Sequence, residues 1–248
     1  MRGHAEPIDE ALVMLGRVVT NELTAAGWAP RELGGHSITT LTRDTRNGVI
    51  AAVELGRTSS QWPGRWPVEI GVRLGVGYEP ALDLMPLLTL RPAVSLVRNP
   101  RTSGRSGFTI SLHGAQDVGS VGRQTVAFIN ENALAFAEQF PDAAAIETAL
   151  RPGREAGGES GEQKNADRET SLRLTLLAAT ARHEEARTLL ARYPAEQGSE
   201  RTARERRRFV RQLTRWLDAG GPPAPPSAQT LALRPPAPRS PRPSWSVA

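Results

Sequence analysis

Histidine and serine are the first residues to test for catalysis in this chain. The four histidines, His4, His36, His113 and His183, are far apart in sequence, and no two have the spacing of metal ligands. His113 could act as a general base beside Ser111, because alternate residues of a strand share a face, but no acid partner is visible. A solvated or hydrogen-bonded histidine at a strand end is the ordinary interpretation. We therefore expect no catalytic residue, no cofactor and no metal site.

The chain contains no cysteine, which excludes disulfides, thiolate zinc sites and cysteine nucleophiles. Its first residues, MRGHAEPIDE, carry charges where a signal peptide needs an apolar region. No apolar run approaches the roughly 18 residues of a membrane span. We expect a cytoplasmic protein with no contact to a membrane.

The first candidate binding surface is the loop GRTSSQWPGRW, residues 56 to 66, together with the strand after it. Its aromatic rings and guanidinium groups form a combination that is favoured at protein interfaces and at stacked bases. Alternatively, one or both tryptophans fold over the open end of the sheet as a lid on the core. The candidate partner-binding residues are Arg57, Trp62, Arg65, Trp66, Glu69 and Arg73.

The second candidate surface is an arginine stripe on a helix expected over residues 200 to 219. At 100° per residue its members fall within an arc of about 80°, opposite an apolar face. They are Arg201, Arg204, Arg208, Arg211 and Arg215. Such a stripe could meet nucleic-acid phosphates, an acidic partner or the acidic surplus of the N-terminal part. The alternative is a solvated outer face on a helix that packs by its other side.

The formal net charge of +5 is unevenly distributed along the 248 residues. Residues 1 to 150 carry a net charge of −2, residues 151 to 219 carry +4, and residues 220 to 248 carry +3. The largest part of the chain is therefore not basic. The pattern gives no general nucleic-acid signature outside the arginine stripe.

Several elements must position these residues. A helix is expected to begin near Ile8, and Gly27 stands where a left-handed residue would end it. Strands are expected over residues 37 to 43 and 49 to 55, which Asn47-Gly48 joins as a hairpin. The stretch PVEIGVRLGV, residues 67 to 76, alternates apolar with charged or glycine residues, which predicts a strand covered on one side. Further strands are expected near residues 94 to 98 and 108 to 113, with helices from about 124 to 139 and 143 to 150.

These elements predict an α+β fold, an antiparallel sheet of about five strands covered on one face by helices. The sheet domain spans residues 1 to 150, and residues 151 to 167 hold no large apolar residue and are expected to form a flexible linker. Residues 168 to 219 form a helical segment. Residues 220 to 248 are proline-rich and expected to be disordered, with a PAPRSPRP stretch that suits either a spacer or a polyproline ligand.

The order helix, Gly27-Trp28, Asn-Gly hairpin, VELGR and VEIGVRLGV resembles bacterial domains of unknown function, in which a helix ending in Gly-Phe or Gly-Trp leads into an antiparallel meander. The resemblance covers roughly residues 8 to 150. Similar small α+β domains include toxin-neutralising immunity proteins. The resemblance implies a fold and a habit of binding partners, and it transfers no functional residue.

The sequence favours a non-enzymatic protein-protein interaction module, immunity-like in its size and class. Its partner is expected to be another protein, bound through the tryptophan loop and the polar face of the third strand. The alternative function is nucleic-acid binding or a regulatory accessory role through the arginine stripe. The second alternative is an enzyme with no recognisable motif.

Overall fold

The computed structural model describes residues 6–31, 37–58, 66–90, 93, 95–99, 102, 108–151, 160–193 and 199–221. Its elements follow one another along the chain as α1 (Glu6–Ala25), β1 (Ala29–Pro30), β2 (Ser37–Asp44), β3 (Val49–Arg57), β4 (Val68–Tyr78), α2 (Glu79–Leu87), β5 (Val97–Arg98), β6 (Thr109–Leu112), α3 (Val118–Ala137), α4 (Ala143–Ala149), α5 (Ser160–Ala179), α6 (His183–Leu190) and α7 (Glu200–Asp218). The predicted α+β class is confirmed.

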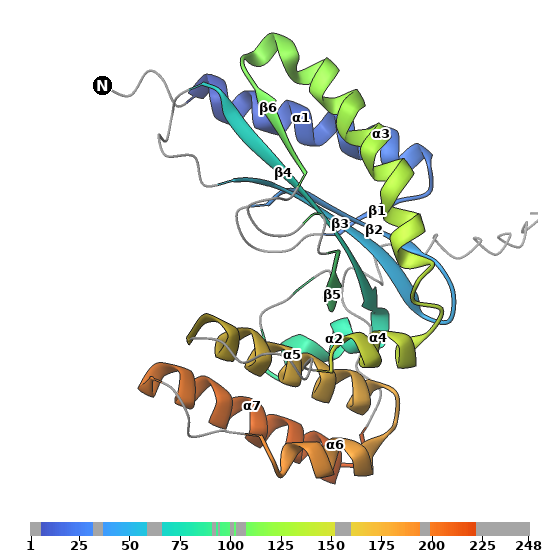
Figure 1. Ribbon diagram of the computed structural model, residues 1–248, viewed down its shortest axis with the longest axis vertical. Coiled ribbons are helices and arrows are strands. Elements are labelled where there is room, and N and C mark those ends of the chain that lie inside the picture. Colours follow the sequence, from blue (N-terminus) through green and yellow to red (C-terminus); the bar gives the residue numbers. More distant parts are fainter. Residues whose placement is uncertain are drawn as a thin grey trace, which may run out of the picture.

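The antiparallel sheet has the strand order β1-β2-β3-β4-β5, and β6 also pairs with β4. The sixth strand, beyond the five expected, is the two-residue β1. The helices α1 and α3 lie side by side across one face of the sheet (Figure 1). The expectation of a sheet with helices on one face therefore holds for its long strands.

The hairpin between β2 and β3 has the predicted Asn47-Gly48 turn. Both residues have a positive φ, 52° and 75°, which the turn requires and which asparagine and glycine adopt at low cost. The turn sets the register of the two strands, in which Thr40 lies opposite Glu54. The next pairing places Glu54 opposite Arg73 of β4.

The main core lies between the sheet and the pair α1 and α3. The apolar residues of β4 are all buried there, as the alternation predicts: Val68, Ile70, Val72, Leu74 and Val76. Trp28, which follows Gly27 at the end of α1, is also buried in this core. Gly27 has a φ of 86°, the left-handed conformation expected of a residue that ends a helix.

The opposite face of the sheet is covered near Gly75. A Cβ atom on Gly75 would stand 2.6 Å from Cβ of Ser95 and 2.7 Å from the carbonyl oxygen of Val97. The chain that leads into β5 therefore lies directly against the backbone of β4. The glycine is needed there because no side chain fits between the two segments.

The C-terminal helices pack beneath the sheet through α2, which follows β4 directly (Figure 1). A second hydrophobic core joins α2, α5, α6 and α7, and its buried members are Leu84, Leu88, Leu174, Leu177, Ala178, Ala186, Phe209, Leu213 and Leu217. On α5, Leu172 and Leu176 belong to the main core. The helical segment is thus packed against the sheet domain.

The position of α5 corrects the predicted linker. The helix begins at Ser160, so the segment 151–167 is helical over its second half, and residues 152–159 lie outside the described residues. The residues of that half include good helix formers such as Glu162, Gln163 and Lys164, and the packed C-terminal half of the helix extends through them. The proline-rich tail after residue 221 also lies outside the described residues.

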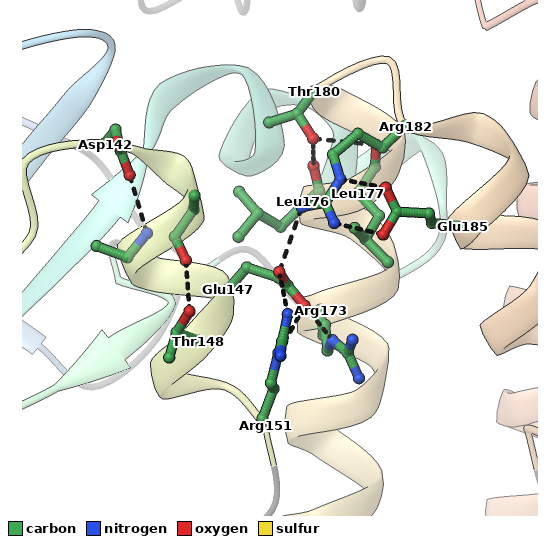
Figure 2. Close-up of polar contacts among 12 residues, drawn as sticks. Asp142, Glu147, Thr148, Arg151, Arg173, Leu176, Leu177, Thr180, Arg182 and Glu185 are labelled. Carbon is green, nitrogen blue, oxygen red and sulfur yellow. Dashed lines mark hydrogen bonds and ion pairs between the residues drawn. The ribbon is translucent and has the colours of Figure 1, made fainter.

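A buried carboxylate on α4 joins three elements (Figure 2). The side chain of Glu147 is 3% exposed, and it accepts hydrogen bonds from Arg173 at 2.6 Å, from Arg182 at 3.2 Å and from Arg151 at 3.1 and 3.2 Å. Arg173 lies on α5, and Arg182 precedes α6 and also pairs with Glu185. Glu147 therefore anchors the helical segment to the sheet domain.

The pKa of Glu147 predicts how stability depends on pH. Burial opposes ionisation, but the hydrogen bonds from Arg151, Arg173 and Arg182 outweigh it and lower the pKa to about 2. A carboxyl with a lowered pKa stabilises the fold above its unfolded pKa, near 4.5, and that contribution disappears as the pH falls toward 2. The free energy of unfolding is measured with urea at pH 6 and at pH 3. The difference in this free energy between the wild type and Glu147→Gln should be smaller at pH 3. A difference that grows at low pH would contradict this assignment.

Among the described residues, none of the helices combines the length and the apolar character that crossing a membrane requires.

Candidate interaction surfaces

The structure describes four of the six predicted partner-binding residues and does not bring these four together. Trp62 and Arg65 lie outside the described residues. Trp66 is half-buried and packs against the main core, as the alternative of a lid on the core expects. Arg57 lies opposite Ile70, on the sheet face that carries the core residues. Because residues directly opposite each other in a ladder share a face, Arg57 points away from the face that carries Arg73.

Glu69 and Arg73 do share a face, the one that α1 and α3 leave uncovered. Glu69 is exposed, and the hydroxyl of Thr58 donates to its carboxylate at 3.1 Å. Between Glu69 and Arg73 lies Gly71, where a Cβ would stand 3.0 Å from the methyl carbon of Thr58. Because Gly71 has no side chain, Thr58 can pack directly against the strand at this position.

Glu54 on β3 lies at the centre of this face. Its Oε1 accepts a hydrogen bond from the Ser37 hydroxyl at 3.0 Å and one from Nη1 of Arg73 at 3.2 Å. Its Oε2 lies 3.9 Å from Nη2 of Arg98 on β5. The Glu54 side chain is 19% exposed, whereas both arginines are 41% exposed. The carboxylate therefore holds two guanidinium groups at the surface.

We call this surface the polar sheet face, and we define it by Glu54, Glu69, Arg73 and Arg98 with Gly56 and Gly71 between them. The half around Glu54 has an excess of positive charge. Burial lowers the pKa of Arg98, and the like charges of Arg168 on α5 and of Arg73 lower it further, while Glu54 raises it. An acidic group from outside would relieve the repulsion among the three arginines.

Glu54 and Arg98 are absent from the sequence-based candidates. Glu54 is the one charged residue within VIAAVEL, residues 49 to 55, and a charge in an apolar strand is a usable signal. The contact between Glu54 and Arg73 depends on the register of β3 with β4. The last residue pair of this ladder is Arg57 with Ile70, and the connection between these two residues is 12 residues long. A connection of that length does not fix the register of the strands that it joins. The contact between Glu54 and Arg73 could therefore not be predicted from the sequence.

The second surface appears where the sequence predicts it. We call Arg201, Arg204, Arg208, Arg211 and Arg215 the arginine ridge, and all five are exposed on α7. The opposite side of the helix is buried in the second core through Phe209, Leu213 and Leu217. Arg206, which the helical wheel places on the apolar side, is 8% exposed.

No protein-family model, curated protein or solved structure matches this chain.

The catalytic hypothesis gains no support from the surroundings of His113. His113 and Ser111 are both exposed. The carboxylate of Asp117 accepts a hydrogen bond from the backbone N–H of His113 at 3.2 Å, and a bond of that kind leaves the imidazole unoriented. Within the described ranges, no three His, Asp or Glu side chains gather as metal ligands would.

Proposed function

We propose that this chain is a non-enzymatic cytoplasmic interaction module that binds another protein through the polar sheet face. One observation carries the proposal: Glu54 holds Arg73 and Arg98 at the surface with an excess of positive charge beside them. Arginine is enriched at protein interfaces and at their energetic centres. The partner surface is acidic, because carboxylates would meet the donors that Glu54 leaves unused.

The geometry favours binding over catalysis. A guanidinium has five N–H donors, and among the described residues Glu54 contacts Nη1 alone of Arg73. A partner carboxylate can therefore bind Arg73 in the bidentate geometry without displacing Glu54. In an immunity-like role, the neutralisation of a protein toxin, carboxylates of the toxin would meet these arginines.

The double variant Arg73→Gln and Arg98→Gln tests the proposal. Glutamine keeps a donor for Glu54 but loses the charge and the bidentate geometry, so we expect the affinity for the partner to fall at least about tenfold. Partners are isolated with the wild-type chain from its own cells and identified by mass spectrometry. The dissociation constant of each purified partner is then measured by calorimetry with both forms.

The matched control is the double variant Arg17→Gln and Arg123→Gln, which removes two exposed arginines from α1 and α3 on the other side of the sheet. The control should bind as the wild type does. Equal affinity of the wild type and the Arg73→Gln, Arg98→Gln variant for every partner, with unchanged circular dichroism, would refute the proposal.

A further inference from the structure

The arginine ridge is the second charged surface of the molecule, and the polar sheet face does not include it. In Figure 1, α7 lies at the side of the helical layer that faces away from the sheet. The apolar side of α7 is buried in the second core, so the ridge on the opposite side of the helix is accessible to a partner.

Two members of the ridge have acidic partners on the same helix. Arg201 pairs with Glu205 at 3.4 Å and Arg204 with Glu200 at 3.8 Å. In the part of the chain that the structure describes, Arg208, Arg211 and Arg215 form no hydrogen bond or ion pair through their side chains. The unneutralised charge is thus concentrated in the C-terminal half of α7.

The helix dipole explains only part of this charge. A cation in the last turn stabilises a helix, and Arg215 lies in the last turn of α7. The effect decays within one turn, so it does not reach Arg208 or Arg211. The dipole therefore accounts for Arg215 alone among these three guanidinium groups, which stand at positions i, i+3 and i+7.

The spacing and the surroundings of the three arginines fit a repeating anion. Seven residues of helix span about 10 Å. One strand of a duplex rises about 3.4 Å along the duplex axis per phosphate, so this span corresponds to about three phosphate steps along that axis. The ridge recognises its ligand by charge alone: among the described residues the exposed large apolar side chains are Val13, Met14 and Leu87, and none of these is on α7.

We propose that Arg208, Arg211 and Arg215 bind the phosphate backbone of duplex nucleic acid without reading its base sequence. Arginine suits this role because its planar guanidinium makes paired hydrogen bonds to phosphate oxygens. The ridge carries no exposed aromatic ring on which an unpaired base could stack, because Trp216 packs against the second core. The preferred ligand is therefore a duplex.

Fluorescence anisotropy with a labelled duplex of mixed sequence tests this site in the full chain. Three phosphate contacts on a duplex contribute about −2.7 to the slope of log K against log salt. Over a fourfold rise in salt, that slope corresponds to an affinity loss of about 40-fold. We expect the triple variant to bind more weakly and to have a slope less negative by about 2.7. The variant is Arg208→Gln, Arg211→Gln, Arg215→Gln.

The matched control removes the same charge elsewhere, at three exposed arginines on α1, the β2–β3 turn and α3. It is Arg17→Gln, Arg46→Gln, Arg123→Gln. Control binding close to wild type supports the site. Equal losses in the two triple variants, or no duplex binding at about 50 mM salt, would overturn it. Displacement of the duplex by polyglutamate at equal charge concentration would also overturn it, in favour of an acidic protein as the ligand.

Discussion

Replacing Glu147 with glutamine is expected to lower the free energy of unfolding at neutral pH by about 3 kcal/mol. The substitution removes the carboxylate that Arg151, Arg173 and Arg182 share, while its size stays the same. The expected loss is large because only the carboxylate is removed. Arg151 and Arg173 keep their charges without this counter-ion, and Arg182 keeps Glu185 alone. A pKa lowered from 4.5 to about 2 corresponds by linkage to a similar figure, about 3 kcal/mol.

Urea unfolding followed by circular dichroism measures this effect. Glu185→Gln is the matched control, since Glu185 contacts the same Arg182 but its side chain is 57% exposed. The control should change the midpoint little, because exposed ion pairs contribute little to stability. Wild-type stability in Glu147→Gln would show that the three arginines find other partners and that the carboxylate does not anchor the helices.

Replacing Gly75 with alanine is expected to lower the free energy of unfolding by up to about 3 kcal/mol. The added methyl group would stand 2.6 Å from Cβ of Ser95 and 2.7 Å from the carbonyl oxygen of Val97. Neither atom belongs to a flexible side-chain end, so the backbone that leads into β5 has to move away from β4. The backbone hydrogen bond from Leu96 N to the Val76 carbonyl oxygen, 2.8 Å long, would be disturbed.

The control for this variant is Gly119→Ala on α3, where the nearest atom to an added Cβ is the end of the Arg123 side chain at 3.8 Å. Alanine in a helix is favoured over glycine by up to about 1 kcal/mol, so the control should be as stable as the wild type or more stable. Equal thermal midpoints for Gly75→Ala and the wild type would contradict the close approach of the two segments.

Local patterns predicted the elements of this fold well. The period-two alternation of β4, the Asn47-Gly48 turn and the apolar spacing of α1 each depend on neighbouring residues, and each is confirmed. The start of α5 was predicted too late. The absence of large apolar residues from 151 to 167 indicates that the segment is exposed, but it does not prevent helix formation when the C-terminal half of the same helix is packed in a core. Exposed polar residues with good helix propensity extend such a helix.

The polar sheet face shows where sequence reasoning stops. Glu69 and Arg73 were found because they alternate with core residues of one strand. Glu54 and Arg98 reach the same face through pairings across strands that are distant in sequence, and no local signal sets those pairings. The arginine ridge was readable because a single helix contains all of it.

The helix α2 has a consequence for how this chain can be divided. The polypeptide leaves the sheet after Tyr78, places Leu84 and Leu88 in the second core, and returns to the sheet at Val97. The helical layer is therefore built from an internal excursion and a C-terminal segment together. If the C-terminal helices were transferred to another protein without α2, the second core would lose Leu84 and Leu88. The sheet and the C-terminal helices therefore cannot be separated without also transferring α2. The arginine ridge and the polar sheet face are consequently carried by a single scaffold that α2 joins together.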